Sequence, residues 1–130
     1  MTHSAQIIDG KLISAALMDD IAAQVAALDV KPDVKPALAV ILVGDDPASH
    51  VYVGNKIKAC AKTGIRSIEH RLPETATNED IERVIADLNA DENVHGILLQ
   101  LPLPKGLDSD RLVQMISPAK DVDGLNILNV

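Results

Sequence analysis

The feature that most constrains the fold is an unbroken apolar run, Ala37–Val43, which contains no polar side chain. Its length suits a strand, and a strand without polar alternation is typical of a parallel sheet that helices cover on both faces. Gly44-Asp-Asp-Pro47 follows directly and indicates a helix start, because Asp46 can cap a helix whose first turn accepts Pro47. The run therefore predicts a buried strand that leads straight into a helix.

The rest of the chain repeats this alternation of strands and helices. Further strands are expected over residues 5–9, 66–72 and 94–101, and helices over 12–28, 47–62, 77–90 and 109–116, with loops over 31–36 and 118–124. Strands that alternate with helices imply βαβ units with right-handed crossovers. We therefore predict an α/β fold, a three-layer α/β/α sandwich with a mainly parallel sheet, formed as one domain over residues 1–130.

Charge and composition exclude several classes of function. The formal net charge is −7, and the chain has no basic stripe and only one aromatic residue, a tyrosine. We therefore expect no nucleic-acid partner. No apolar stretch approaches the ~20 residues that span a bilayer, and no charged leader precedes an apolar segment, so no membrane association is expected. The single cysteine, Cys60, cannot form an internal disulfide, which favours a cytoplasmic location.

Three polar segments are candidates for the functional site. Two of them follow predicted strands, at residues 44–49 and 100–104, and the third is the loop segment 121–124. Ligands of open α/β sheets bind outside the carboxyl ends of the strands. Because all three segments can reach this edge, it is the expected site.

The helix that begins at Pro47 carries a stripe of candidate side chains. At about 100° per residue, Ser49, Tyr52 and Lys56 fall on one side of the helix and border an apolar strip. Lys56 would then lie at the rim of the core, where a partly desolvated amine can act as a base. Most helical lysines are solvated and a lone tyrosine is usually a packing residue, so spacing alone does not establish catalysis.

No cofactor or metal site is expected within the chain itself. It has neither a Gly-x-Gly-x-x-Gly turn nor a phosphate-binding P-loop, and its histidines lack metal-ligand spacing. Asp121-Val-Asp-Gly124 resembles part of a calcium loop, but the remaining ligands are missing.

A non-catalytic α/β binding module with a receiver or flavodoxin layout is the alternative interpretation. Asp45 or Asp46 could imitate the phosphorylated aspartate of a receiver, but no convincing Lys and Thr pair follows the later strands. A flavin-binding module would be expected to offer more than one aromatic ring.

Three motifs carry a resemblance to a known family. They are Val43-Gly-Asp-Asp-Pro-Ala-Ser-His-Val-Tyr-Val-Gly-Asn-Lys-Ile-Lys-Ala-Cys60, Gly96-Ile-Leu-Leu-Gln-Leu-Pro-Leu-Pro104 and Pro118-Ala-Lys-Asp-Val-Asp-Gly124. Their order and content closely resemble the N-terminal catalytic domain of the bifunctional methylenetetrahydrofolate dehydrogenase/methenyltetrahydrofolate cyclohydrolase family, from Ile8 to the end of the chain. Asn126 and Ile127 depart from the His and Pro that are frequent in the family.

The resemblance implies a role for each matching residue. Lys56 is the catalytic lysine, and Gln100 hydrogen-bonds it and holds its protonation state. Tyr52 stacks on the folate ring system, and Asp123 anchors the pterin. The remaining substrate-binding residues that line the cleft would be Ser49, Val53, Leu101 and Pro102.

The resemblance also implies the reaction and its partners. NADP would oxidise 5,10-methylenetetrahydrofolate to 5,10-methenyltetrahydrofolate, and water would convert that cation to 10-formyltetrahydrofolate, within one-carbon metabolism and purine biosynthesis. NADP would bind to a Rossmann domain that is absent from these 130 residues. We therefore expect a fragment of a cytoplasmic homodimer, and one that is not a dehydrogenase by itself.

Overall fold

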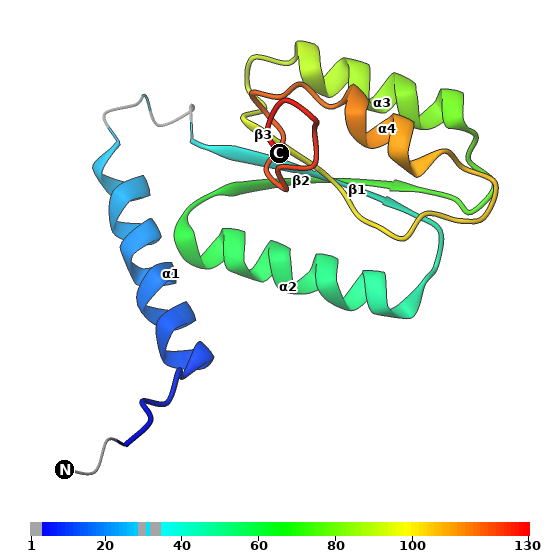
Figure 1. The fold of residues 1–130 in the computed structure, drawn as a ribbon. Helices are drawn as coiled ribbons and strands as arrows, with labels where there is room; N and C mark the ends of the chain where they lie inside the picture. Colours follow the sequence, from blue (N-terminus) through cyan, green and yellow to red (C-terminus); the bar gives the residue numbers. More distant parts are fainter. Residues whose placement is uncertain (1–3, 29–30, 32–34) are drawn as a thin grey trace.

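The computed structural model describes residues 4–28, 31 and 35–130, and it confirms the predicted α/β fold. Its elements are α1 Gly10–Ala27, β1 Ala37–Val43, α2 Pro47–Thr63, β2 Arg66–Leu72, α3 Asn78–Ala90, β3 Gly96–Leu99 and α4 Ser109–Met115. The described strands form one parallel sheet in the order β2-β1-β3. Helix α2 covers one face and α3 and α4 cover the other, while α1 stands beside α2 (Figure 1).

The apolar run of β1 forms the centre of the core because its side chains alternate between the two faces of the sheet. Ala39 and Ile41 belong to the larger cluster under α3 and α4, whereas Val40 and Leu42 belong to the cluster under α2. All four residues are at most 2% exposed. The absence of polar alternation in this strand is therefore explained by helices on both faces.

The boundaries of α2 follow from local chemistry. Asp46 is the N-cap, Pro47 is the first helical residue, and Gly64 ends the helix in the left-handed conformation with a φ of 81°. That conformation favours glycine because a Cβ atom would be strained there. These three positions set both the start of α2 at the carboxyl edge of the sheet and its length.

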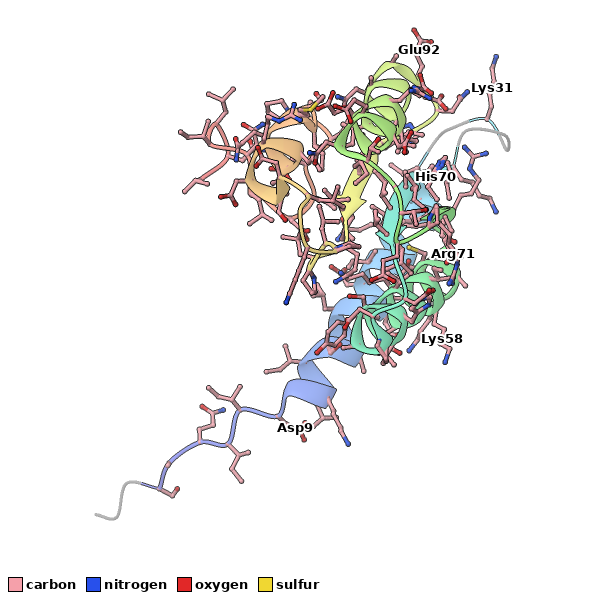
Figure 2. All side chains as sticks on the ribbon, turned by 90° about the vertical axis from the view of Figure 1, so that its right-hand side faces the viewer. Asp9, Lys31, Lys58, His70, Arg71 and Glu92 are labelled. Atoms are coloured by element: carbon pink, nitrogen blue, oxygen red, sulfur yellow. The ribbon has the colours of Figure 1, made fainter. Side chains whose placement is uncertain are left out.

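The predicted strand at residues 5–9 is wrong. Residues 4–9 form no regular element, and the carboxylate of Asp9 instead caps α1 by accepting from the backbone N–H groups of Lys11 and Leu12. Figure 2 shows this segment extending away from the start of α1 at Asp9. A short segment without a partner strand gains no ladder hydrogen bonds, so the local cap decides its conformation.

Two other predicted elements differ in detail. β3 is shorter than the expected 94–101 and consists of Gly96–Leu99, although the backbone N–H of Gln100 still donates to Ile41 O at 2.9 Å. Helix α1 buries none of its residues, although Met18, Ile21, Ala22 and Val25 are partly buried on the side that faces α2. Half of the predicted loop at 31–36, residues 32–34, lies outside the described residues. No helix in the described part of the chain is both long and apolar enough to span a membrane.

Candidate active site at the carboxyl edge of the sheet

Lys56 and Gln100 meet where α2 passes the end of β3. The Nζ atom of Lys56 donates a hydrogen bond to Oε1 of Gln100 at 2.8 Å, across 44 positions of sequence. Lys56 is half-buried, and none of the described carboxylates forms an ion pair with it. Its amine is thus held by a neutral acceptor, and the two other donors of an ammonium group are left for a ligand.

The side-chain amide of Gln100 is oriented by its surroundings. Gln100 is 8% exposed, and its Nε2 atom donates to the carbonyl oxygen of Leu101 at 2.8 Å. Because Nε2 is committed to a carbonyl, Oε1 must face the amine of Lys56. The end of β3 therefore fixes an acceptor in the position where the lysine needs it.

Tyr52 lies one helical turn before Lys56, as the spacing predicted. It is 56% exposed, so its ring is available to a planar ligand. Leu101 is half-buried and Pro102 is exposed, and the two are joined by a cis peptide bond. These three residues present accessible apolar surface near the Lys56–Gln100 pair.

Two of the predicted lining residues, Val53 and Ser49, have packing or capping contacts within the chain. Val53 is 0% exposed and packs with Val40, Leu42 and Leu98 beneath α2. Ser49 is 1% exposed, and both its backbone N–H and its Oγ donate to Oδ2 of Asp46 at 2.9 Å. Apolar burial and helix capping occupy these two side chains, and their contact with a ligand stays a prediction.

Asp46 is an acceptor dedicated to the start of α2. The backbone N–H of Ser49, followed by its hydroxyl, holds the pKa of Asp46 below the ordinary value of 3.8. This carboxylate is committed to the cap, which argues against the receiver-like role considered for it.

We expect Asp46→Ala to lower the melting temperature at neutral pH. The difference in melting temperature between the unmodified protein and the variant should become smaller at acidic pH. Because the folded-state pKa lies below the unfolded value of 3.8, the stabilisation is complete above that value and is lost as the pH falls through the folded-state pKa. Thermal unfolding followed from neutral pH down to about pH 2 measures this difference. Asp45→Ala is the matched control, since that side chain is 92% exposed. If the melting-temperature difference between the unmodified protein and Asp46→Ala stays constant with pH, the Asp46 carboxylate does not stabilise the start of α2 as assigned.

Asp123 lies on the loop that runs along the open side of β3. Asp121 pairs with Ile97 in parallel, and Val122 lies beside Gly96 and Leu38 near the start of β3. Asp123 is exposed, and none of the described residues donates a hydrogen bond to its carboxylate. The structure therefore joins Lys56 to Gln100 directly and leaves Asp123 on a neighbouring loop, without a direct contact to that pair.

Asp121 has a different function from Asp123. Desolvation acts to raise the pKa of Asp121, but hydrogen bonds led by the backbone N–H of Asn126 and the side chain of Asn129 lower it below the ordinary value. Its Oδ2 atom accepts from Asn126 N at 2.8 Å and from Asn129 Nδ2 at 3.1 Å. The first aspartate of the motif thus folds the loop, and the second is left free.

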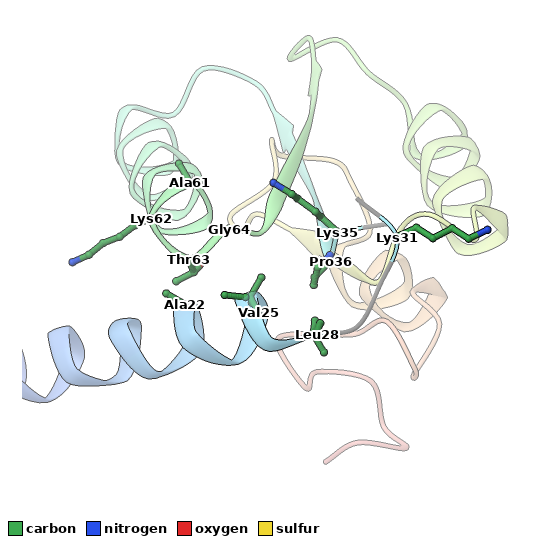
Figure 3. Close-up of a pocket in the computed structure, with 11 residues that line it drawn as sticks. Ala22, Val25, Leu28, Lys31, Lys35, Pro36, Ala61, Lys62, Thr63 and Gly64 are labelled. Carbon is green, nitrogen blue, oxygen red and sulfur yellow. The ribbon is translucent and has the colours of Figure 1, made fainter. Parts of the chain in front are cut away.

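Two hollows flank the sheet at opposite edges. One of about 630 Å³ lies at the carboxyl edge, where Asp46, Glu74 and Pro102 are among its lining residues. The other, of about 450 Å³, lies between the C-terminal ends of α1 and α2 at the amino edge (Figure 3). Lys31 and Lys62 border the second hollow but point away from it to opposite sides (Figure 3). None of the candidate site residues lines that second hollow.

Lys120 is a residue whose function the sequence interpretation missed. Its ammonium group lies at the C-terminal end of α3, a helix with no basic residue in its last turn. A helix end usually attracts a cation, but α1 and α4 also lack a basic residue in the last turn, so the sequence held no signal that pointed to Lys120.

The chain matches known proteins over nearly its whole length. Residues 8–123 match the model of the catalytic domain of tetrahydrofolate dehydrogenase/cyclohydrolase. "Bifunctional protein FolD" of Rhodopseudomonas palustris is 55% identical over 126 residues, which are 97% of this chain and 43% of that protein.

Solved structures agree with this match. The FolD methylenetetrahydrofolate dehydrogenase/cyclohydrolase of Campylobacter jejuni has a TM-score of 0.89 and 42% identity, and the alignment covers 93% of this chain and 43% of that one. The Trypanosoma brucei dehydrogenase-cyclohydrolase, complexed with NADP cofactor and inhibitor, has a TM-score of 0.86 and 35% identity over 95% of this chain and 42% of that one. The chain thus spans less than half the length of these relatives. With its family model matched from residue 8 to residue 123, the chain belongs to the tetrahydrofolate dehydrogenase/cyclohydrolase family.

Proposed function

We propose that this chain is the folate-binding catalytic domain of an enzyme that oxidises 5,10-methylenetetrahydrofolate to 5,10-methenyltetrahydrofolate and hydrolyses the product to 10-formyltetrahydrofolate. The observation that carries the proposal is the 2.8 Å hydrogen bond between Lys56 and Gln100, made by two residues of separate family motifs. The resemblance further supports a cytoplasmic homodimer that serves one-carbon metabolism and purine biosynthesis.

The hydrolysis requires one group that both accepts and donates a proton. Water adds to the cationic methenyl carbon and loses a proton, and a proton then reaches N5 as the bond from carbon to N5 breaks. The balance is one methenyl cation plus water giving 10-formyltetrahydrofolate and one released proton. Lys56 is suited to both transfers because an amine can accept the first proton and return it to N5.

The neutral partner of Lys56 matters for this chemistry. A carboxylate beside the amine would hold it as a fixed ammonium, which would repel the cationic substrate. The amide oxygen of Gln100 instead orients the amine through a hydrogen bond without bringing a negative charge. We infer that Gln100 is a positioning residue for Lys56.

The described residues do not fit NADP. A pyrophosphate binds where a helix N-terminus offers free backbone N–H groups. The N-termini of the described helices are instead capped by side chains of the chain itself, namely Asp9, Asp46, Thr77 with Asp80, and Asp108. The hydride acceptor would have to be held by protein outside these residues.

We expect Asp123→Ala to weaken the binding of a folate analogue by roughly ten- to a hundredfold, because a free carboxylate can accept two charge-assisted hydrogen bonds from the pterin. Fluorescence or calorimetric titration of the full-length protein measures this, with thermal unfolding run in parallel. Asp87→Ala on α3 is the matched control, since Asp87 is also exposed. Unchanged affinity together with a lowered melting temperature would show that Asp123 only organises its turn; failure of the unmodified protein to bind folate would remove the proposed function.

A further inference from the structure

Lys120 anchors the loop that carries Asp123 to the end of α3, and it has no role in the proposed hydrolysis. Lys120 Nζ donates to three main-chain carbonyl oxygens, those of Leu88 at 3.0 Å, Asn89 at 2.9 Å and Asp91 at 2.8 Å. A lysine ammonium has three N–H donors, so these contacts use all of them. The side chain therefore has one well-defined position and no donor left for a substrate.

The end of α3 has a physical need for this cation. The last carbonyl groups of a helix lack intrahelical partners and carry the negative end of the helix dipole. Helix α3 ends at Ala90 and has no basic residue in its last turn. Lys120 supplies both the charge and the hydrogen bonds from about thirty residues further along the chain.

The main chain of Lys120 is tied to the sheet. Its carbonyl oxygen accepts from Ile97 N at 2.7 Å, and its own N–H donates to Ser117 O at 2.8 Å. Ile97 is 0% exposed and lies in β3, and it pairs with the next residue, Asp121. Lys120 therefore joins the end of α3, the strand β3 and the start of the Asp123 loop.

The far end of the same loop is fastened independently. Asn126 is 5% exposed, and its side-chain amide donates to Gln114 O and Ile116 O, each at 3.2 Å, at the end of α4. Asp121 accepts the backbone N–H of Asn126 at 2.8 Å and so closes the loop. Asp123 lies between these two anchored points, exposed and without a partner among the described residues.

From these contacts we propose that Lys120 is a positioning residue that acts through Asp123, by fixing the loop to α3 so that the Asp123 carboxylate is already placed when the folate arrives. The proposal rests on the folate-binding function proposed above. A loop that must be ordered during binding loses affinity, whereas a loop that is fixed in advance does not. Removing the hydrogen bonds between Lys120 and the end of α3 should therefore weaken substrate binding and leave the chemistry at Lys56 largely intact.

The test is the steady-state hydrolysis of 5,10-methenyltetrahydrofolate by the full-length enzyme and its Lys120→Met variant. Met keeps most of the apolar stem and removes all three hydrogen bonds. We expect KM to rise about tenfold while kcat changes by less than about twofold. Lys120→Arg keeps the charge and several donors and should return KM to within about threefold of the original value. Lys58→Met is the matched control, because Lys58 projects from the exposed side of α2 (Figure 2).

A double-mutant cycle separates positioning from general stability. If Lys120 acts through Asp123, Lys120→Met should produce no further rise in KM in an Asp123→Ala background. A full additional rise in that background, or an unchanged KM in the single variant, would overturn the proposal. If Lys120→Met yields no soluble protein, Lys120→Gln enters the same cycle, with an expected rise of at least about threefold because one amide replaces three charged contacts.

The cycle also distinguishes this proposal from the proposed function. If Asp123→Ala weakens folate binding but Lys120→Met leaves KM unchanged, the folate site stands and the positioning role fails. If Asp123→Ala changes nothing, the role of Asp123 in the folate site and the role of Lys120 fail together.

Discussion

Lys56→Met in the full-length enzyme is expected to reduce the hydrolysis of 5,10-methenyltetrahydrofolate by at least about a thousandfold, the upper range for the loss of a general acid–base group. Met retains the apolar stem of Lys56 beside α2 but has no nitrogen that can accept a proton from water or return it to N5. The fold should be unaffected, because the structure gives Lys56 one side-chain hydrogen bond and no ion pair among the described residues. The loss of the methenyl absorbance with time measures the rate, and circular dichroism checks the fold.

Two companion variants make this result specific. Gln100→Ala should cause a smaller loss than Lys56→Met and should shift the pH–rate profile, since it removes the acceptor that orients the amine while leaving the amine itself. Lys58→Met should leave the rate unchanged, because Lys58 is exposed and lies outside the site. Hydrolysis near the original rate in Lys56→Met would refute the role of Lys56, and an unchanged pH–rate profile in Gln100→Ala would refute the role of Gln100.

The bounds of helices and strands were predicted best where the capping or turn residues and the pattern of apolar residues indicate the same boundary. The bounds of β1 and β2 are as expected because apolar or alternating runs end at Gly and Pro residues that permit no continuation. The start of α2 at Pro47 followed from Asp46, whose carboxylate caps the helix in the structure. Where a pattern was too short to decide, as at residues 5–9, the neighbouring cap at Asp9 determined the conformation instead.

The contact between Lys56 and Gln100 was predictable from the sequence, whereas the burial of the surrounding side chains was not. Helical spacing put Tyr52 and Lys56 on one side of α2, and strand order brought Gln100 to the lysine. Spacing does not report how deeply a side chain lies, so it could not show that Val53, named as a lining residue through the resemblance, is fully buried. The contacts of Lys120 were also beyond prediction, because they link a loop to a helix end about thirty residues away.

Two of the strand-to-helix connections of the described sheet bring carboxylates to the start of a helix, and this determines how the 130 residues should respond to NADP. β1 leads to α2 through Asp45 and Asp46, and the latter already accepts the backbone N–H of Ser49 in the first turn of the helix. β2 leads to α3, where Thr77 and Asp80 form a reciprocal capping box. A pyrophosphate approaching either helix would meet carboxylates in place of free N–H groups, so both charge and hydrogen bonding oppose it.

We therefore expect the 130-residue chain alone to show no calorimetric heat of NADP binding up to about millimolar concentration. A dissociation constant above that concentration corresponds to a binding free energy weaker than about −4 kcal/mol. Dehydrogenase activity should be absent as well, since hydride transfer needs the nicotinamide held against the folate bridge. Hydrolysis of the methenyl compound should be weak, because the pair of Lys56 and Gln100 is present but water exclusion and positioning depend on a second wall to the cleft. The control is the full-length protein, which should bind NADP under the same conditions. Micromolar NADP binding by the short chain would reveal a cofactor site that the capped helices do not account for, and near-normal hydrolysis would show that Lys56 and Gln100 need no second wall.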